Sequence, residues 1–151
     1  MSTDQPELTD APDEVPMPTP VEADAILQFI VSLANDVDGF EMGVTLFTPS
    51  GPVSGILTGI DKWFDAWEQM VKEGSTGHSF VEGLNKTLAE RRSELPPQTQ
   101  DTIRYVHLTG AHFISGGQMV PVSGQPGLLW RGQLTDVSGW SPVKMSLPPR
   151  D

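Results

Sequence analysis

The chain has 151 residues, no cysteine, and a formal net charge of −11 at pH 7, since 20 acidic residues outnumber 9 basic ones. This length suits one domain, and the absence of cysteine excludes disulfides and thiolate chemistry. The acidic balance argues against a nucleic-acid partner, because phosphates are contacted by clustered Lys and Arg. No apolar run is long enough to span a bilayer, and the start does not resemble a signal peptide, so we expect no membrane partner.

The first 22 residues differ in composition from the rest of the chain. They hold several prolines and no Lys or Arg, and their acidic residues are Asp4, Glu7, Asp10, Asp13, Glu14 and Glu22. Repelling charges and extended X-Pro pairs cannot bury enough apolar surface to offset the loss of chain entropy. We therefore expect a disordered acidic tail over residues 1–22, a single domain over residues 23–147, and a short flexible end over residues 148–151.

The first part of the domain is predicted to be a helix followed by a hairpin. Apolar residues repeat at helical spacing over residues 23–35, and Asp24 is placed to cap the helix. Two arms rich in apolar and β-branched residues, 40–47 and 53–60, flank a Pro/Gly turn and indicate a β-hairpin. Gly55 inside the second arm predicts a bulge or a sharp bend.

A helical pair is predicted next. Asp61 could cap a helix over residues 62–73, and Gly74 is a natural end for it. Ser79 and Glu82 have the spacing of a capping box at the start of a second helix. That helix is expected to end where Leu95 precedes two prolines.

The last third of the chain is predicted to be sheet. Strand patterns cover residues 103–108, 111–115, 119–122 and 128–137, with a tight turn at Thr109–Gly110 between the first two. A short edge strand is expected within residues 140–147. The predicted fold class is α+β: a mostly antiparallel sheet, open or curled into a small barrel, with a leading helix and an inserted helical pair.

A search for catalytic, cofactor-binding and metal-ligating groups finds no convincing set. His107 and His112 would approach each other across the predicted turn, but a metal needs a third ligand and supporting partners. No nucleophile elbow and no phosphate-binding loop is present. We therefore expect no cofactor, no metal and no enzymatic activity.

A short pattern occurs twice. "SGILTGIDKW" contains Gly55, Leu57 and Trp63, and "LLWRGQLTDVSGW" contains Gly132, Leu134 and Trp140 at the same spacing, with further matches between them. A unit of strand, bend and cap used twice in one sheet would explain this pattern without a functional site. Internal duplication and chance remain open as alternatives.

The second copy also contains the strongest candidate for a partner-binding surface. Neighbouring residues on a strand point to opposite faces, so one of Trp130 and Arg131 is expected to face outward. An exposed arginine there could pair with a carboxylate across the sheet or with a partner, and the internal pairing is favoured. The candidate partner-binding residues are Trp130, Arg131 and Trp140.

Several segments together resemble the GvpU family of gas vesicle accessory proteins. They are "ILQFIVSLAND", "GVTLFTPSGPVSGILTG", "YVHLTGAHFISGG" and "LLWRGQLTDVSGW". The resemblance implies a cytoplasmic, non-enzymatic protein that associates with gas vesicles and assists their assembly, clustering or regulation through weak protein contacts. The implied partners are the vesicle shell, other gas vesicle proteins, or further copies of the chain. The family's motif positions are expected to be structural for the most part.

A second interpretation comes from a different class of protein. The stretch "GVTLFTPSGPVSGILTGID" loosely resembles the first motif of Sm-like barrels, which would imply a small binding module for peptide or RNA. The acidic body counts against RNA, and the inserted helices count against that fold.

Overall fold

In the computed structural model, the described residues are 15–17, 21–74 and 77–146. Most of the acidic start and all of residues 147–151 lie outside them, so the predictions made for the two ends stay predictions. Residues 15–17 and 21–22 are exposed and belong to no helix or strand.

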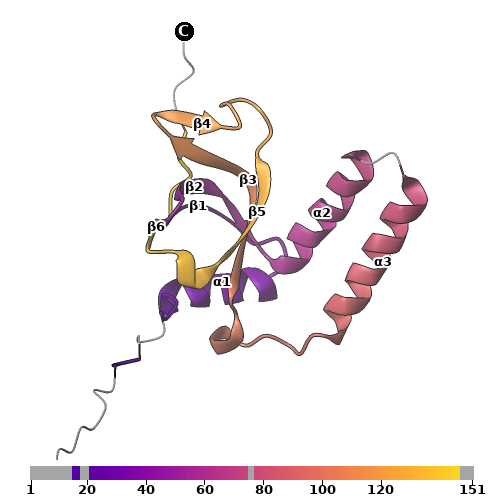
Figure 1. The fold of residues 1–151 in the computed structure, drawn as a ribbon, viewed down its shortest axis with the longest axis horizontal. Coiled ribbons are helices and arrows are strands. Elements are labelled where there is room, and N and C mark those ends of the chain that lie inside the picture. Colours follow the sequence, from indigo (N-terminus) through magenta and orange to yellow (C-terminus); the bar gives the residue numbers. More distant parts are fainter. Residues whose placement is uncertain (1–14, 18–20, 75–76, 147–151) are drawn as a thin grey trace, which may run out of the picture.

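The described chain contains three α-helices, two short 3₁₀ helices and six strands (Figure 1). In chain order they are α1 (Ala25–Asp36), β1 (Glu41–Thr48), β2 (Gly51–Thr58), α2 (Ile60–Gly74), α3 (His78–Glu94), η1 (Gln100–Thr102), β3 (Tyr105–Ser115), β4 (Gln118–Val120), β5 (Leu128–Gln133), η2 (Leu134–Asp136) and β6 (Gly139–Ser141). The strands form one antiparallel sheet in the order β4-β3-β2-β1-β6, and β5 also pairs with β3. The predicted α+β class is confirmed.

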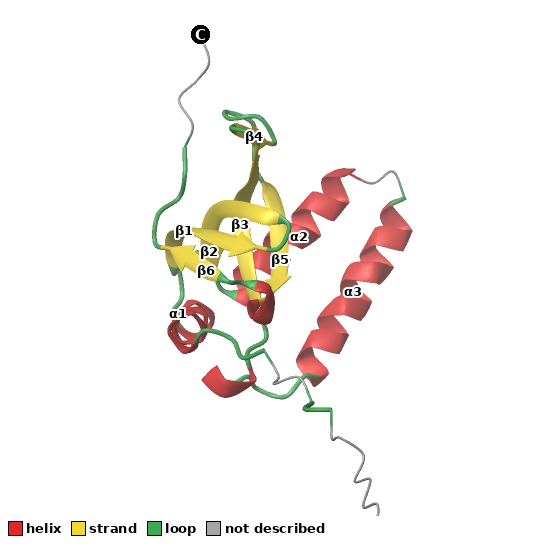
Figure 2. Cartoon of the chain, turned by 60° about the vertical axis from the view of Figure 1, so that its left-hand side comes forward, coloured by secondary structure: helices red, strands yellow, loops and turns green. Residues whose placement is uncertain are grey.

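The sheet is not a closed barrel, so the barrel alternative is wrong. Strand β5 pairs with β3, and β6 pairs with β1, but the described residues of β5 and β6 do not pair with each other. A barrel needs every strand paired on both sides. The sheet is strongly curved but keeps two edges (Figure 2), and β5 is one of them.

Strand β3 runs straight through the position where a tight turn was predicted. Gly110 has a φ of 56°, a left-handed conformation that glycine adopts at little cost, but the chain does not reverse there. Instead, the register of β3 shifts near Gly110 against both β2 and β5. The predicted hairpin is therefore a bulge, and β3 continues because both of its sides are paired.

The bulge predicted at Gly55 is on the neighbouring strand, because between the pairs Ser54–His112 and Ile56–Thr109 β2 has one residue, Gly55, and β3 has two. The register between β2 and β3 shifts between Ser54 and Ile56. A Cβ at Gly55 would lie 2.9 Å from the carbonyl oxygen of Thr109 and 3.1 Å from the Cα of Ala111. Glycine at this position lets two strands approach where their registers slip.

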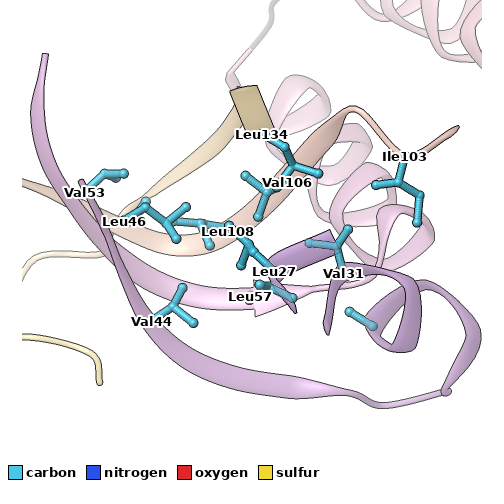
Figure 3. Packing of buried hydrophobic residues seen from close by; sticks show 12 residues of the cluster. Leu27, Val31, Val44, Leu46, Val53, Leu57, Ile103, Val106, Leu108 and Leu134 are labelled. Atoms are coloured by element: carbon cyan, nitrogen blue, oxygen red, sulfur yellow. The ribbon is translucent and has the colours of Figure 1, made fainter. Parts of the chain in front are cut away.

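The hydrophobic core lies between α1 and the concave face of the sheet. Figure 3 shows Leu27 and Val31 of α1 close to Leu57 and Leu108 of the sheet. All four side chains are essentially inaccessible to solvent. Burial of each contributes about 1.5–3 kcal/mol, so the apolar side of α1 is firmly packed on the sheet.

The helix starts are only partly as predicted. The Asp24 carboxylate accepts hydrogen bonds from the backbone N–H groups of Ile26 and Leu27, at 2.9 and 3.0 Å, which confirms it as the N-cap of α1. For α2 the predicted cap is wrong. The Ile60 N–H donates to the Asn35 side chain at 2.9 Å, a partner 25 residues away that local sequence does not reveal.

The predicted capping box of α3 is also wrong, because the N-cap is Gly77 and the helix begins one residue before Ser79. Its end before the two prolines is confirmed, with Leu95 as C-cap. Helices α2 and α3 form an antiparallel pair at the side of the sheet (Figures 1 and 2). Within the described ranges, no helix has the length and apolar character to cross a membrane.

Candidate functional site

The candidate residues lie around β5, the edge strand that pairs with one half of β3. The register places His107 opposite Arg131 and Leu108 opposite Trp130. Since Leu108 is buried in the core, Trp130 lies on the inner face and Arg131 on the outer face. The open question of which neighbour faces solvent is thereby answered in favour of Arg131, which is exposed.

Trp130 is a half-buried residue that packs on the core from β5. Its six-membered ring lies directly over Gly132, where an added Cβ would come within 2.2 Å of the ring. Gly132 is therefore required by the indole that covers it. Part of the Trp130 surface remains accessible and lines an open hollow with Pro49, Phe113 and Asp136.

Arg131 is held in place by two groups on the neighbouring strand β3. Its Nε donates a hydrogen bond to Nε2 of His107 at 3.1 Å, and its guanidinium carbon stands 3.7 Å from the centre of the Tyr105 ring. Internal pairing was the favoured expectation, but the partner is an imidazole and an aromatic face instead of a carboxylate. Among the described residues, no carboxylate oxygen lies within 4.0 Å of the Arg131 guanidinium.

His107 can accept this hydrogen bond because it is neutral. Its side chain is 2% exposed, and the Trp63 and Phe64 rings of α2 lie 5.2 and 6.1 Å from it. Burial, reinforced by the positive charges of Arg131 and Arg92, lowers the His107 pKa from 6.5 to about 3. With Nε2 as acceptor, the proton is on Nδ1, which is buried and has no hydrogen-bond partner among the described groups.

Arg92 and Asp61 support the same region. The Arg92 guanidinium carbon lies 4.2 Å from the centre of the Phe64 ring, and its Nη2 pairs with the Asp61 carboxylate. Asp61 is thus an ion-pair partner of α3, not the cap of α2. Arg92 itself is half-buried.

Trp140, the third candidate, lies on β6 opposite Leu46 of β1. It is half-buried against the core. The pKa of the Asp24 carboxyl is lowered, chiefly by the backbone hydrogen bond from Leu27, with further contributions from a Trp140 side-chain hydrogen bond and the Ile26 backbone. Trp140 and Asp24, at the start of α1, line the same hollow.

Two adjoining hollows bring the three candidates to the same end of the molecule. One is lined by Trp130 and Arg131, the other by Trp140, and both are lined by Pro49 and Asp136. The first hollow has a volume of about 800 Å³, within the range of ligand pockets, but it is open to solvent on one side.

The two strand histidines do not form the pair that was considered from sequence. Both lie on β3, and His112 stands beyond the Gly110 bulge with its ring nitrogens 3.1 Å from the Gly110 carbonyl and 3.2 Å from the Gln125 carbonyl. Within the described residues, no group of three or more His, Asp or Glu side chains could hold a metal ion.

The repeated pattern is not a repeated structure. After Leu57 the chain enters α2, whereas after Gln133 it enters the 3₁₀ helix η2 and then strand β6. Leu57 and Leu134 are both buried, and Gly55 and Gly132 both stand where another group approaches closely. The close neighbours differ, however, because Gly55 faces the backbone of β3 and Gly132 faces the Trp130 ring of its own strand.

Comparison of the sequence with models of known protein families identifies the family of this chain. The family model described as gas vesicle protein GvpU-like matches residues 24–145, which is most of the chain. The chain belongs to the GvpU-like family. Comparison with curated proteins gave no significant match, and neither did comparison with solved structures.

The match spans every helix and strand that the described residues of this GvpU-like protein form, so the site around β5 is part of the family's own domain. Two residues of that site hold Arg131: Tyr105, which the sequence reasoning missed, and His107, which it considered only as a metal ligand. Their spacing of two within a predicted strand put them on one face. Only the β3–β5 register shows that this face is the one that Arg131 lies on.

Proposed function

We propose that this GvpU-like protein is a non-enzymatic accessory protein of the cytoplasm that assists gas vesicle assembly, clustering or regulation through weak protein contacts. The observation that carries the proposal is Arg131: an exposed guanidinium, held by His107 and Tyr105, that pairs with no carboxylate among the described residues. The chain as a whole is strongly acidic, so a basic group left in this state is available to a carboxylate of another chain.

The surroundings of Arg131 support this role. Trp130 and Trp140 are aromatic side chains of the kind that anchor protein interfaces, and each lines a hollow beside η2. The outer side of β5 is an unpaired sheet edge among the described strands. The proposed partners are the vesicle shell, other gas vesicle proteins, or a second copy of the chain.

The first experiment is co-flotation with intact gas vesicles. Purified protein is mixed with vesicles, the vesicles are floated by slow centrifugation, and the protein in the floating layer is measured. We expect the wild-type protein to rise and Arg131→Ala to rise less, because the exposed cation is lost. Arg91→Ala removes an exposed arginine from α3 and is the matched control. Circular dichroism checks that each variant is folded.

Two results would contradict the proposal. If the wild-type protein stays below the vesicles, direct vesicle contact is wrong. If Arg131→Ala and Arg91→Ala rise equally, the contact does not involve the β5 site. A titration with RNA at low salt separates the Sm-like alternative, because RNA binding would weaken steeply as salt is added.

A further inference from the structure

The loop of residues 121–127 joins β4 to β5 at the top of the molecule in Figure 1. Inside the loop, the Gln125 N–H donates to the Val122 carbonyl at 3.0 Å and closes a turn. Among the described residues, a contact between the His112 ring and the Gln125 carbonyl is the only hydrogen bond that ties residues 122–126 to another part of the chain. The attachment of the loop therefore depends on one histidine of β3.

The His112 ring lies between two backbone carbonyl oxygens. Its Nδ1 is 3.1 Å from the carbonyl oxygen of Gly110, and its Nε2 is 3.2 Å from the carbonyl oxygen of Gln125. A carbonyl oxygen can only accept. A neutral imidazole has one N–H, so its other nitrogen would turn a lone pair toward an oxygen, whereas a protonated ring donates from both nitrogens. The arrangement therefore favours the protonated ring by one hydrogen bond.

The charges around His112 oppose its protonation. The side chain is 7% exposed and lines a hollow formed by β3, β4, the loop and the C-terminal segment. Among the described residues that line this hollow, Lys144 is the only other ionisable group, and its amine disfavours a second positive charge nearby. On β2 the residue opposite His112 is Ser54, which is uncharged. Because burial and Lys144 act against the charge, the protonated ring depends on both carbonyls staying in place.

We propose that His112 is a pH-sensitive clamp on the β4–β5 loop. The protonated ring donates to the carbonyls of Gly110 and Gln125 and fixes the loop to the bulge of β3. Loss of one proton removes one of the two hydrogen bonds and releases the loop at Gln125. Histidine is the side chain that ordinarily changes its charge between pH 5 and pH 8. The clamp is therefore closed on the acidic side of this range and open on the alkaline side.

The clamp acts at the point where the chain enters β5. Gly127 lies directly on the bulge, since a Cβ added to it would be 2.2 Å from the carbonyl carbon of Gly110. The next residue, Leu128, forms the first pair of β5, opposite Ala111. A loop held at Gln125 keeps the chain seated on the bulge just before this pair. The clamp therefore controls how firmly the start of β5 is held.

Nuclear magnetic resonance of the full-length chain at about pH 5.5 and about pH 8 tests the clamp. The nitrogen resonances of the His112 ring report its protonation, because the two nitrogens resonate alike in the protonated ring and differently in the neutral one. Backbone order parameters of residues 123–125 report the motion of the loop. His112→Gln keeps a side-chain N–H donor but gains no charge in this range. His78→Gln, at the start of α3, is the matched control.

We expect a doubly protonated His112 ring and a rigid loop at the lower pH, and a neutral ring and a mobile loop at the higher pH. The loop order parameters should fall from about 0.85 to below about 0.6 in wild type and in His78→Gln. In His112→Gln they should not depend on pH. If either the ring protonation or the loop order is the same at both pH values in wild type, the proposal is wrong. It is also overturned if the loop of His112→Gln responds to pH as wild type does.

The two wild-type measurements decide the question even if His112→Gln fails to fold. They are made without vesicles, so their outcome is separate from that of the flotation assay. One consequence rests on the proposed function: because β5 carries Trp130 and Arg131, vesicle contact should weaken between about pH 5.5 and about pH 8 in wild type but not in His112→Gln.

Discussion

Replacing His107 tests whether a neutral imidazole beneath Arg131 makes the stability of the protein depend on pH. Burial, Arg131 and Arg92 lower the folded-state pKa to about 3, against 6.5 in the unfolded chain. As pH falls through 6.5, the unfolded chain takes up a proton that the folded chain does not, so stability is lost. The loss begins near pH 6.5 and is complete below about pH 3.

The size of the effect at pH 5 follows from these two values. The unfolded imidazole gains about 2 kcal/mol from protonation between pH 7.5 and pH 5, and the folded one gains almost nothing. In His107→Gln this contribution is absent, whereas the amide oxygen can still accept from Arg131. The stability difference between wild type and variant should therefore shrink by about 2 kcal/mol over this interval.

Urea unfolding at pH 7.5 and at pH 5 measures this difference. With a slope of roughly 2 kcal/mol per molar urea, the gap between the two midpoints should change by about 1 M. Carboxylates also titrate in this range, but they are common to both proteins and cancel in the comparison. A gap that stays constant between the two pH values would refute the reasoning, since it would mean that His107 is charged or exposed in the folded chain.

Three further predictions concern the stability of the fold and are checked by thermal melting. Gly132→Val should destabilise the protein by about 1–3 kcal/mol, because its Cβ would fall within 2.2 Å of the Trp130 ring; an unchanged melting temperature contradicts that packing. Gly83→Ala, in α3 with no atom within 4 Å of the added Cβ, should instead stabilise by about 0.5–1 kcal/mol, and a loss would show that α3 is not helical there. Asp24→Ala should cost about 1 kcal/mol through the lost cap of α1, whereas Glu22→Ala, just outside the helix, should be nearly neutral; equal melting temperatures would count against the cap.

Local patterns in the sequence were enough for much of the fold. The helix over α1 with its Asp24 cap and the β1–β2 hairpin depend on neighbours within a few residues. Periodicity, capping and turn chemistry act over that range, so they can be read without a structure. The same holds for the stop of α3 before its prolines.

Local reasoning failed where a distant segment supplied the deciding contact. Gly110 has turn chemistry, but β3 passes through it because partner strands hold both of its sides. Asp61 has the right position to cap α2, but Asn35 does so from the end of α1. The local preference for a turn at Gly110 and for an N-cap at Asp61 was in both places overridden by hydrogen bonds to residues far away in the sequence.

The same distinction between local and long-range causes applies to the candidate site. The sequence by itself determined that Trp130 and Arg131 point to opposite faces, because alternation along a strand is a local property. Only the tertiary structure decided which of them faces solvent and what holds it, since both answers depend on the register between β5 and β3. This register places Arg131 opposite His107, which is 24 positions away in the sequence. The register is fixed because it buries Leu108 and Val106 on the other face of the sheet.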